Sequence, residues 1–179
     1  MVVGSAAAPV QGDDIAIVRL ARAGDRTAFA ALHQRYARVV HGLLLARVQP
    51  EIADDLVQDV FIVVMQRLHT LDDAAAFAGW LCRIARNLAV DHHRRVRRFD
   101  PLPPDVGVAP PPTAEARQML EIVRSLPDAY AETLILRLVE GLTGPEIAER
   151  TGLTPGSVRV NLHRGMKLLR ERLGEEVEP

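Results

Sequence analysis

Residues suited to hydrogen bonding with DNA recur at helical spacing near the end of the chain: Arg159, Asn161, His163, Arg164 and Lys167. Arginine can form two parallel hydrogen bonds with guanine or with a phosphate, and asparagine can do the same with adenine. Residues 155–173 hold five basic side chains and one acidic side chain, a net charge of +4. This stretch therefore favours nucleic-acid binding; the plainer alternative is a solvated basic face on an ordinary helical hairpin.

A second basic group lies between residues 77 and 98. Arg83 and Asn87 are four residues apart and share a helix face, where they are suited to contacting bases. Four more arginines follow and are suited to binding phosphates: Arg94, Arg95, Arg97 and Arg98. The alternative is a solvated basic end that complements the helix dipole. Two basic helices far apart in the sequence favour two separate DNA contacts.

Residues suited to catalysis or metal binding do not form a known site. Asp55 and Asp59 share a helix face, but Asp54 lies about 100° around the helix from Asp55. Zinc-ligand spacing is absent from the nearest candidates, which are Cys82, His92 and His93. The sequence also has no Gly-rich phosphate loop and no G-x-S-x-G turn. We therefore expect no enzyme activity, no metal and no cofactor, and interpret the aspartates as a solvated or partner-facing patch.

The C-terminal basic residues lie in a predicted helix-turn-helix. Thr143 and Glu146 have the spacing of a capping box, and Gly152 suits the left-handed residue that ends a helix. Thr154 is then a predicted N-cap, so that a second helix begins at Pro155. Its predicted buried stripe contains apolar residues three or four apart: Val158, Leu162, Met166, Leu169 and Leu173.

The rest of the chain is also predicted to be helical, because alternating β-rich runs are absent. Helices are expected over residues 13–24, 25–48, 51–68, 77–98, 114–125 and 127–141. The helix over residues 77–98 has a predicted buried stripe of large apolar residues: Phe77, Trp80, Leu81, Ile84 and Leu88. Cys82 is expected to be a small core residue.

Proline content divides the chain into two parts. Residues 100–113 hold six of the twelve prolines, which predicts an extended linker. The fold class is therefore all-α, with two small helical domains joined by a Pro-rich linker. The predicted segments are an N-terminal tail (1–12), a four-helix domain (13–98), the linker (99–113), a helix-turn-helix domain (114–174) and a C-terminal tail (175–179).

Composition limits the possible functions further. The 179 residues are 48% apolar but only 4% aromatic, and the net charge is −1. DNA binding would therefore depend on local basic faces and not on the charge of the whole chain. A single cysteine excludes an internal disulfide and suits a reducing cytosol. Apolar runs are too short to span a bilayer, so we expect a cytoplasmic protein without membrane insertion.

Taken together, these motifs resemble an extracytoplasmic-function (ECF) sigma factor, a small sigma-70-type initiation subunit of bacterial RNA polymerase. ADDLVQDVFIVVMQRL, beginning at Ala53, resembles region 2.2. FAGWLCRIARNLAVDHHRR, beginning at Phe77, resembles regions 2.3 and 2.4. The segment from Leu126 to Leu173 resembles region 4. The order and linkage of these motifs make the signal more specific than the helix-turn-helix alone.

The resemblance implies a role for each group of residues. The β′ clamp of core RNA polymerase would bind around Asp55, Leu56, Gln58, Asp59 and Phe61. The minus-ten promoter element would be bound, with one base flipped out of its strand, by a group of loop and α-helical residues: Thr70, Leu71, Asp72, Asp73, Arg83, Arg86, Asn87, Arg94 and Arg95. The minus-thirty-five element would be bound by Thr154, Ser157, Arg159, Asn161, His163, Arg164 and Lys167.

The same resemblance implies the partners: core RNA polymerase through its β′ clamp and β flap, promoter DNA, and an anti-sigma factor that holds the protein inactive. Such a protein directs initiation and promoter melting without covalent chemistry. Two alternatives remain open from the residues. One is a helix-turn-helix regulator that binds duplex DNA without polymerase, and the other is an adaptor that sequesters an anti-sigma factor.

Overall fold

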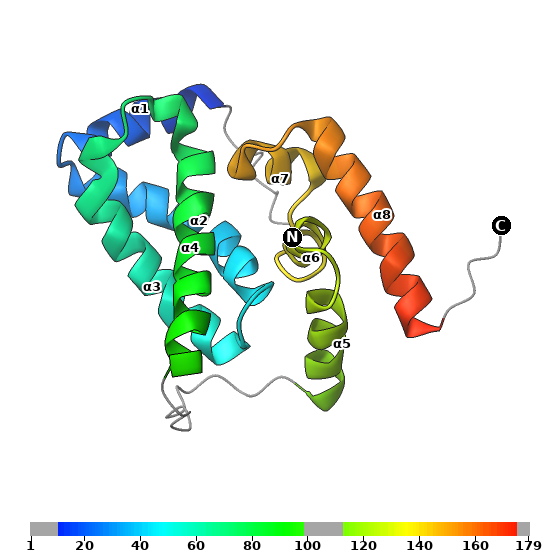
Figure 1. Ribbon diagram of the computed structural model, residues 1–179. Helices are drawn as coiled ribbons and strands as arrows, with labels where there is room; N and C mark the ends of the chain where they lie inside the picture. Colours follow the sequence, from blue (N-terminus) through cyan, green and yellow to red (C-terminus); the bar gives the residue numbers. More distant parts are fainter. Residues whose placement is uncertain (1–10, 99–112, 175–179) are drawn as a thin grey trace, which may run out of the picture.

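The computed structural model describes residues 11–98 and 113–174, and these residues form helices and turns without a strand (Figure 1). The α-helices are α1 (Gln11–Arg22), α2 (Arg26–Leu45), α3 (Pro50–Arg67), α4 (Phe77–Arg98), α5 (Ala114–Arg124), α6 (Asp128–Leu138), α7 (Gly144–Thr151) and α8 (Pro155–Leu173). Two short 3₁₀ helices, η1 (Leu68–Thr70) and η2 (Ala74–Ala76), lie between α3 and α4. The all-α prediction is confirmed for these residues, while most of the predicted linker and both tails lie outside them.

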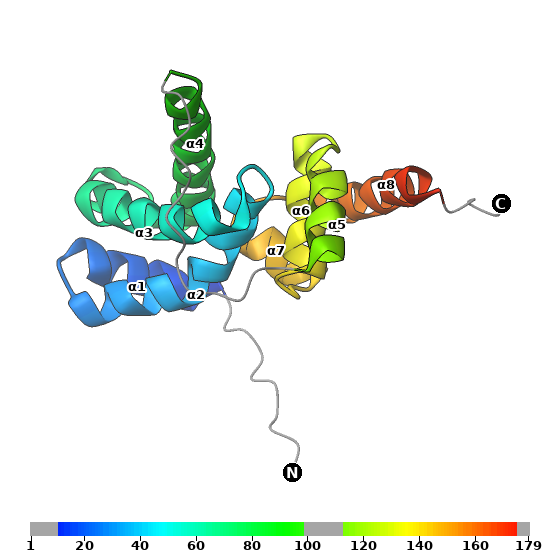
Figure 2. The same cartoon turned by 90° about the horizontal axis from the view of Figure 1, so that it is seen from below.

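Helices α1–α4 form one unit, which we call the N-unit, and α5–α8 form a second, the C-unit. The two lie side by side in both views (Figures 1 and 2). Helix α2 is central, because it contacts α1, α3 and α4 in its own unit and also α6 and α7 of the C-unit. None of the helices in residues 11–98 and 113–174 combines the length and apolar character needed to cross a membrane.

Local sequence signals explain where the helices of the N-unit begin. Asp25 caps α2, because its carboxylate accepts hydrogen bonds from the backbone N–H groups of Thr27 (2.8 Å) and Ala28 (3.0 Å). Pro50 lies at the start of α3, where its missing N–H leaves no partner unsatisfied. Between these helices the core is mainly aliphatic, as expected from the low aromatic content, and includes Leu32, Val40, Leu43 and Val64.

The buried side of α4 differs from the predicted one. Phe77 and Leu81 are buried as expected, but Trp80, Ile84 and Leu88 are only partly buried. Their expected places are taken by small residues, Cys82, Ala85 and Ala89, which are all fully buried. Small side chains let a helix approach its neighbours closely, and a pattern search weighted towards large apolar residues misses them. The expectation that Cys82 is a core residue agrees with its burial.

Helices α7 and α8 form the predicted helix-turn-helix. Thr143 and Glu146 make the capping box, with the Thr143 N–H donating to the Glu146 carboxylate at 2.8 Å. Gly152 ends α7 in the left-handed conformation (φ 74°), which favours glycine. Thr154 caps α8 by accepting a hydrogen bond from the Ser157 N–H at 3.1 Å.

The buried stripe of α8 is narrower than predicted. Val158 and Leu169 are buried, but Leu162 and Met166 are only partly buried and Leu173 is 39% exposed. The line of closest contact with α6 instead passes through Gly165. A Cβ atom at Gly165 would lie 3.1 Å from the Leu134 side chain and 3.2 Å from that of Tyr130. Leu162 and Met166 pack against the edge of the core and also line an open apolar hollow with Lys167.

The contact at Gly165 predicts the effect of enlarging this residue. Gly165→Val forces two methyl groups into occupied space and should lower the free energy of unfolding by about 1–3 kcal/mol. Gly156→Val is the matched control, since the nearest atom to a Cβ there is 3.9 Å away, and it should change stability by less than about 0.5 kcal/mol. Urea titration measures both, and equal stabilities would contradict the packing described.

Candidate nucleic-acid interface

The outer face of α8 is polar and exposed. It contains six of the seven residues expected at the minus-thirty-five element: Thr154, Ser157, Arg159, His163, Arg164 and Lys167. The seventh, Asn161, is partly buried, and its amide donates to the Thr133 hydroxyl on α6 at 3.4 Å. In both views α8 lies on the side of the C-unit away from the N-unit (Figures 1 and 2). The basic face of α8 is therefore open to a ligand as large as duplex DNA.

The outer face of α4 carries the second basic group. Arg83 and Asn87 are exposed one helical turn apart, and Arg94 and Arg95 are exposed near the end of the helix. Arg86 differs, because its Nε and Nη2 atoms each donate to a Glu132 oxygen of α6 at 2.8 Å. These hydrogen bonds raise the pKa of the Arg86 guanidinium above its already high usual value. Arg86 is therefore not part of a freely exposed face in this arrangement.

The loop expected to hold a flipped base is hydrogen-bonded to α1. The Arg22 guanidinium donates to the carbonyl oxygens of Leu71 (2.7 Å) and Asp72 (3.3 Å). The Asp73 carboxylate accepts from the Ala75 N–H at 2.9 Å, and Thr70 is exposed. Leu71 is buried, so most of its side chain lies in the core.

An open hollow of about 470 Å³ lies beside this loop. The N-unit contributes Leu71, Ala75, Ala76, Ala78, Gly79, Trp80 and Arg83 to its lining, and the C-unit contributes Ala148, Glu149, Gly152 and Leu153. An aromatic ring and a guanidinium are groups on which an unstacked base can stack. The start of α4 and the loop therefore form a concave surface of the right chemistry, with the end of α7 against one side of it.

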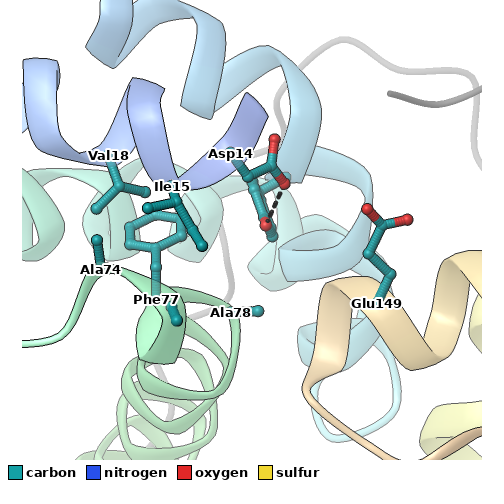
Figure 3. Close-up of a pocket in the computed structure, with 9 residues that line it drawn as sticks. Asp14, Ile15, Val18, Ala74, Phe77, Ala78 and Glu149 are labelled. Carbon is teal, nitrogen blue, oxygen red and sulfur yellow. Dashed lines mark hydrogen bonds between the residues drawn. The ribbon is translucent and has the colours of Figure 1, made fainter. Parts of the chain in front are cut away.

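A smaller hollow of about 100 Å³ lies where α1, η2 and α4 meet (Figure 3). Ile15, Val18 and Phe77 line it, and Glu149 approaches from α7. The dashed line in Figure 3 is the hydrogen bond from the Tyr36 hydroxyl to Asp14, at 2.8 Å. Burial and this hydrogen bond raise the pKa of Tyr36 above its usual value. Asp14 also pairs with Arg35, so it fastens α1 to α2.

The acidic patch on α3 is exposed. Asp55, Gln58 and Asp59 are all exposed, whereas Leu56 and Phe61 are buried. The two apolar residues therefore support the patch from the core, and their side chains are not available for direct contact with a partner. Across the described parts of the chain, no three His, Cys, Asp or Glu residues are grouped so as to hold a metal ion.

Comparison with known proteins identifies the family. A model of sigma-70 region 2 matches residues 32–99, and a model of sigma-70 region 4 matches residues 116–169. Together the two matches cover more than half of the chain, the first within the N-unit and its end and the second within the C-unit. The chain belongs to the sigma-70 family. This sigma factor has core RNA polymerase and promoter DNA as its partners, as the family does.

Its relatives place this sigma factor in the ECF group. It is 33% identical to RNA polymerase sigma factor CarQ of Myxococcus xanthus, over 86% of this chain and 94% of CarQ. It is 30% identical to the ECF RNA polymerase sigma-E factor of Haemophilus influenzae, over 89% and 95% of the two chains. Among solved structures, the fold is similar to that of CnrH in a complex with the cytosolic domain of CnrY (TM-score 0.61, 23% identity, covering 92% and 99%).

The contacts between the two units were missed by sequence reasoning. Glu132 of α6 binds Arg47 and Arg86, and Glu140 binds His41 of α2, with Nδ1 and Oε1 2.6 Å apart. The members of these pairs are 46 to 99 residues apart in the chain. No spacing rule connects such residues, and each has the appearance of an ordinary surface charge in the sequence.

The His41 pair predicts a pH dependence. The hydrogen bond to Glu140 raises the pKa of His41, against the opposing effect of burial, and the charge of Asp54, 3.5 Å away, acts in the same direction as Glu140. Arg38 also faces Glu140, at 3.6 Å. Because the pKa is higher in the folded state, the stabilisation is complete below the unfolded pKa of about 6.5 and is lost as pH rises through the folded pKa.

We therefore expect the stability difference between the natural protein and His41→Asn to be larger at pH 6 than at pH 8.5. Denaturant titration at the two pH values measures it. His33→Asn serves as the control for the loss of an imidazole, because His33 packs against the Phe61 ring. A difference that does not change with pH would contradict the protonated His41–Glu140 pair.

Proposed function

We propose that this sigma factor directs core RNA polymerase to promoters through two DNA contacts, with its N-unit at the minus-ten element and its C-unit at the minus-thirty-five element. The supporting observation is that each unit matches a sigma region and presents a basic helix face, on α4 and on α8. Most of the interaction energy comes from phosphate contacts, which set the register. A few base contacts then choose the promoter.

The minus-thirty-five element is contacted by the exposed residues of α8, with Arg159, His163 and Arg164 nearest the bases and Lys167 at the backbone. Asn161 joins them only if its contact with Thr133 is released. The polar start of α8, at Thr154 and Ser157, suits a phosphate, because helix N-termini favour anions.

The minus-ten element is bound and melted by the exposed side of α4 and the adjoining loop. Arg83 and Asn87 are placed for bases, while Arg94 and Arg95 are placed for phosphates. The hollow beside Trp80 holds a base flipped out of the strand, with Thr70, Asp72 and Asp73 at its edge. Flipping costs a few kcal/mol of stacking, which stacking on Trp80 and contact with Arg83 repay in part. Arg86 contributes a phosphate contact once Glu132 releases it.

The acidic patch on α3 binds the β′ clamp of core polymerase, and the C-unit binds the β flap. Asp55, Gln58 and Asp59 form a surface that attracts basic side chains, and the buried Leu56 and Phe61 hold it in shape. Because core polymerase is the partner, we place the working protein in the cytoplasm. It supplies binding energy to strand opening and carries out no covalent chemistry.

Regulation by an anti-sigma factor is part of the proposal. The fold resembles that of the sigma factor RpoE of Bartonella quintana, solved with the anti-sigma factor NepR (TM-score 0.54, 18% identity, covering 83% of this chain and 98% of RpoE). The similar CnrH fold was solved with the cytosolic domain of CnrY. A partner that holds both units at once would keep this chain from polymerase.

The minus-thirty-five contact predicts the effect of removing Arg164. Arg164→Ala should weaken initiation at minus-thirty-five-dependent promoters by about 1–3 kcal/mol, roughly 5- to 150-fold, without changing affinity for core polymerase. Run-off transcription and core-binding titration measure the two effects. Arg26→Ala, which removes one charge from an exposed position at the start of α2, should leave both unchanged. Equal losses in initiation and core binding would show that Arg164 is not a specific DNA contact.

The acidic patch predicts the opposite pattern. Asp55→Ala combined with Asp59→Ala should lower affinity for core polymerase about tenfold or more, because two charges near the centre of an interface are lost. DNA binding by the free protein should not weaken. Glu115→Ala with Glu171→Ala is the matched control, since both carboxylates are exposed in the C-unit. Unchanged affinity for core polymerase would refute the assignment of this surface.

A further inference from the structure

The interface between the two units is built around a buried carboxylate, Glu132, which is 6% exposed. Arg86 of α4 donates two hydrogen bonds to it, both 2.8 Å long. Arg47, just after α2, pairs with the same carboxylate through Nη1, and its Nη2 donates to Asp128 at 2.7 Å. We call these four residues the Glu132 cluster. It joins α4 and the turn after α2 to α6 through one carboxylate.

Burial makes this arrangement depend on contact between the units. Removing a carboxylate from water is costly unless positive charge and hydrogen bonds replace the lost hydration. Within the described residues, the cationic partners of Glu132 both belong to the N-unit. Glu140 repeats the pattern, since it is 7% exposed and its partners His41 and Arg38 are both on α2. When the units separate, both sets of ion pairs are therefore lost and water hydrates their charged groups instead.

Closure of the two units also covers part of the surface proposed for the minus-ten element. While Glu132 accepts from Nε and Nη2 of Arg86, this edge of the guanidinium is not available to a phosphate. The end of α7 borders the hollow beside Trp80 and Arg83. A Cβ atom at Gly152 would lie 3.5 Å from the backbone of Gly79, so the two units touch at the first turn of α4. The basic face of α8, in contrast, stays open.

We propose that the free chain holds itself in a closed form, in which Glu132 occupies the position of a DNA phosphate on Arg86 and withholds this part of the minus-ten surface. Single-stranded DNA and Glu132 then compete for the same guanidinium, and the C-unit must move away before the whole surface can bind. The inference rests on the proposed role of the N-unit at the minus-ten element. It adds a means of self-regulation that needs no second protein.

A second feature of the interface allows the closed form to be opened without changing any charge. Gly42 of α2 faces α6 so closely that a Cβ atom there would lie 2.7 Å from Leu136 Cδ2 and 3.0 Å from Glu140 Cγ. A larger side chain at this position collides with Leu136 and Glu140 of the C-unit and therefore disfavours the closed packing of the units. Glutamine is a better helix former than glycine, so Gly42→Gln opens the interface without weakening α2.

The test uses the full-length chain without core polymerase. Fluorophores on cysteines introduced at the exposed positions Gln66 of α3 and Glu171 of α8, in a Cys82→Ala background, report the distance between the units. Cys82 is replaced because its thiol lies 3.7 Å from the Arg150 carbonyl oxygen of α7, where separation of the units exposes it. Fluorescence anisotropy with a random-sequence, 20-nucleotide single-stranded DNA reports binding. Glu132→Gln and Gly42→Gln are compared with Glu115→Gln, which removes the same charge as Glu132→Gln from an exposed position. Circular dichroism checks that each variant is folded.

We expect both interface variants to lengthen the distance and to bind the DNA roughly tenfold more tightly, as when a competent state populated at about 10% becomes the main state. Glu115→Gln should do neither. An unchanged distance in both variants would overturn the closed form, and a longer distance without tighter binding would overturn the withholding of Arg86. Failure of the proposed function is recognised separately, by the absence of core-dependent transcription with the natural chain.

Discussion

A carboxylate taken out of water must be matched by positive charge, and Glu132 is matched by Arg47 and Arg86 of the other unit. Removing one partner of a buried ion pair typically costs about 3–5 kcal/mol, so this contact strongly constrains where α6 can lie. Glu140, which lies just after the C-terminal end of α6, and His41 of α2 add a second constraint. Together with the apolar core that the two units share, they explain why the units are packed as a single body and not merely connected.

Each unit, in turn, places its binding surface by simple helical geometry. In the C-unit the capping box at Thr143 and the left-handed Gly152 set the angle between α7 and α8. The close contact at Gly165 then fixes which side of α8 remains outside. In the N-unit the small residues Cys82, Ala85 and Ala89 bring one side of α4 into the core. Its basic residues are consequently exposed on the opposite side, where a phosphate backbone can reach them.

Local features of this fold could be predicted from the sequence, and long-range ones could not. Caps at Asp25, Thr143 and Thr154 are recognised because the residues that interact are two to three positions apart. The buried stripes of α4 and α8 were partly wrong, because Ala85 and Gly165 are buried for their small size and not for their hydrophobicity. The acidic residues of α3 are exposed as predicted, and Leu56 and Phe61, which belong to the apolar side of the same helix, are buried.

The interface between the units was beyond sequence reasoning for a different reason. Arg86 and Glu132 satisfy the ordinary expectations for exposed residues on amphipathic helices, and their pairing depends on how α4 and α6 are placed in space. The resemblance to sigma factors therefore implied that Arg86 binds DNA but gave no sign that it has a competing partner. One residue with two possible partners connects the recognition surface to the arrangement of the whole molecule.

Transcription in vitro tests the account most directly. Purified core RNA polymerase, this chain and genomic DNA fragments are combined, and the 5′ ends of the transcripts are mapped. The account predicts discrete start sites that depend on the chain and share two sequence elements, near minus ten and minus thirty-five. Specific binding to duplex DNA without core polymerase, and no dependent start sites, would contradict it and indicate a regulator of the helix-turn-helix type. Core binding that never yields a transcript, even with Gly42→Gln, would contradict it in favour of an adaptor.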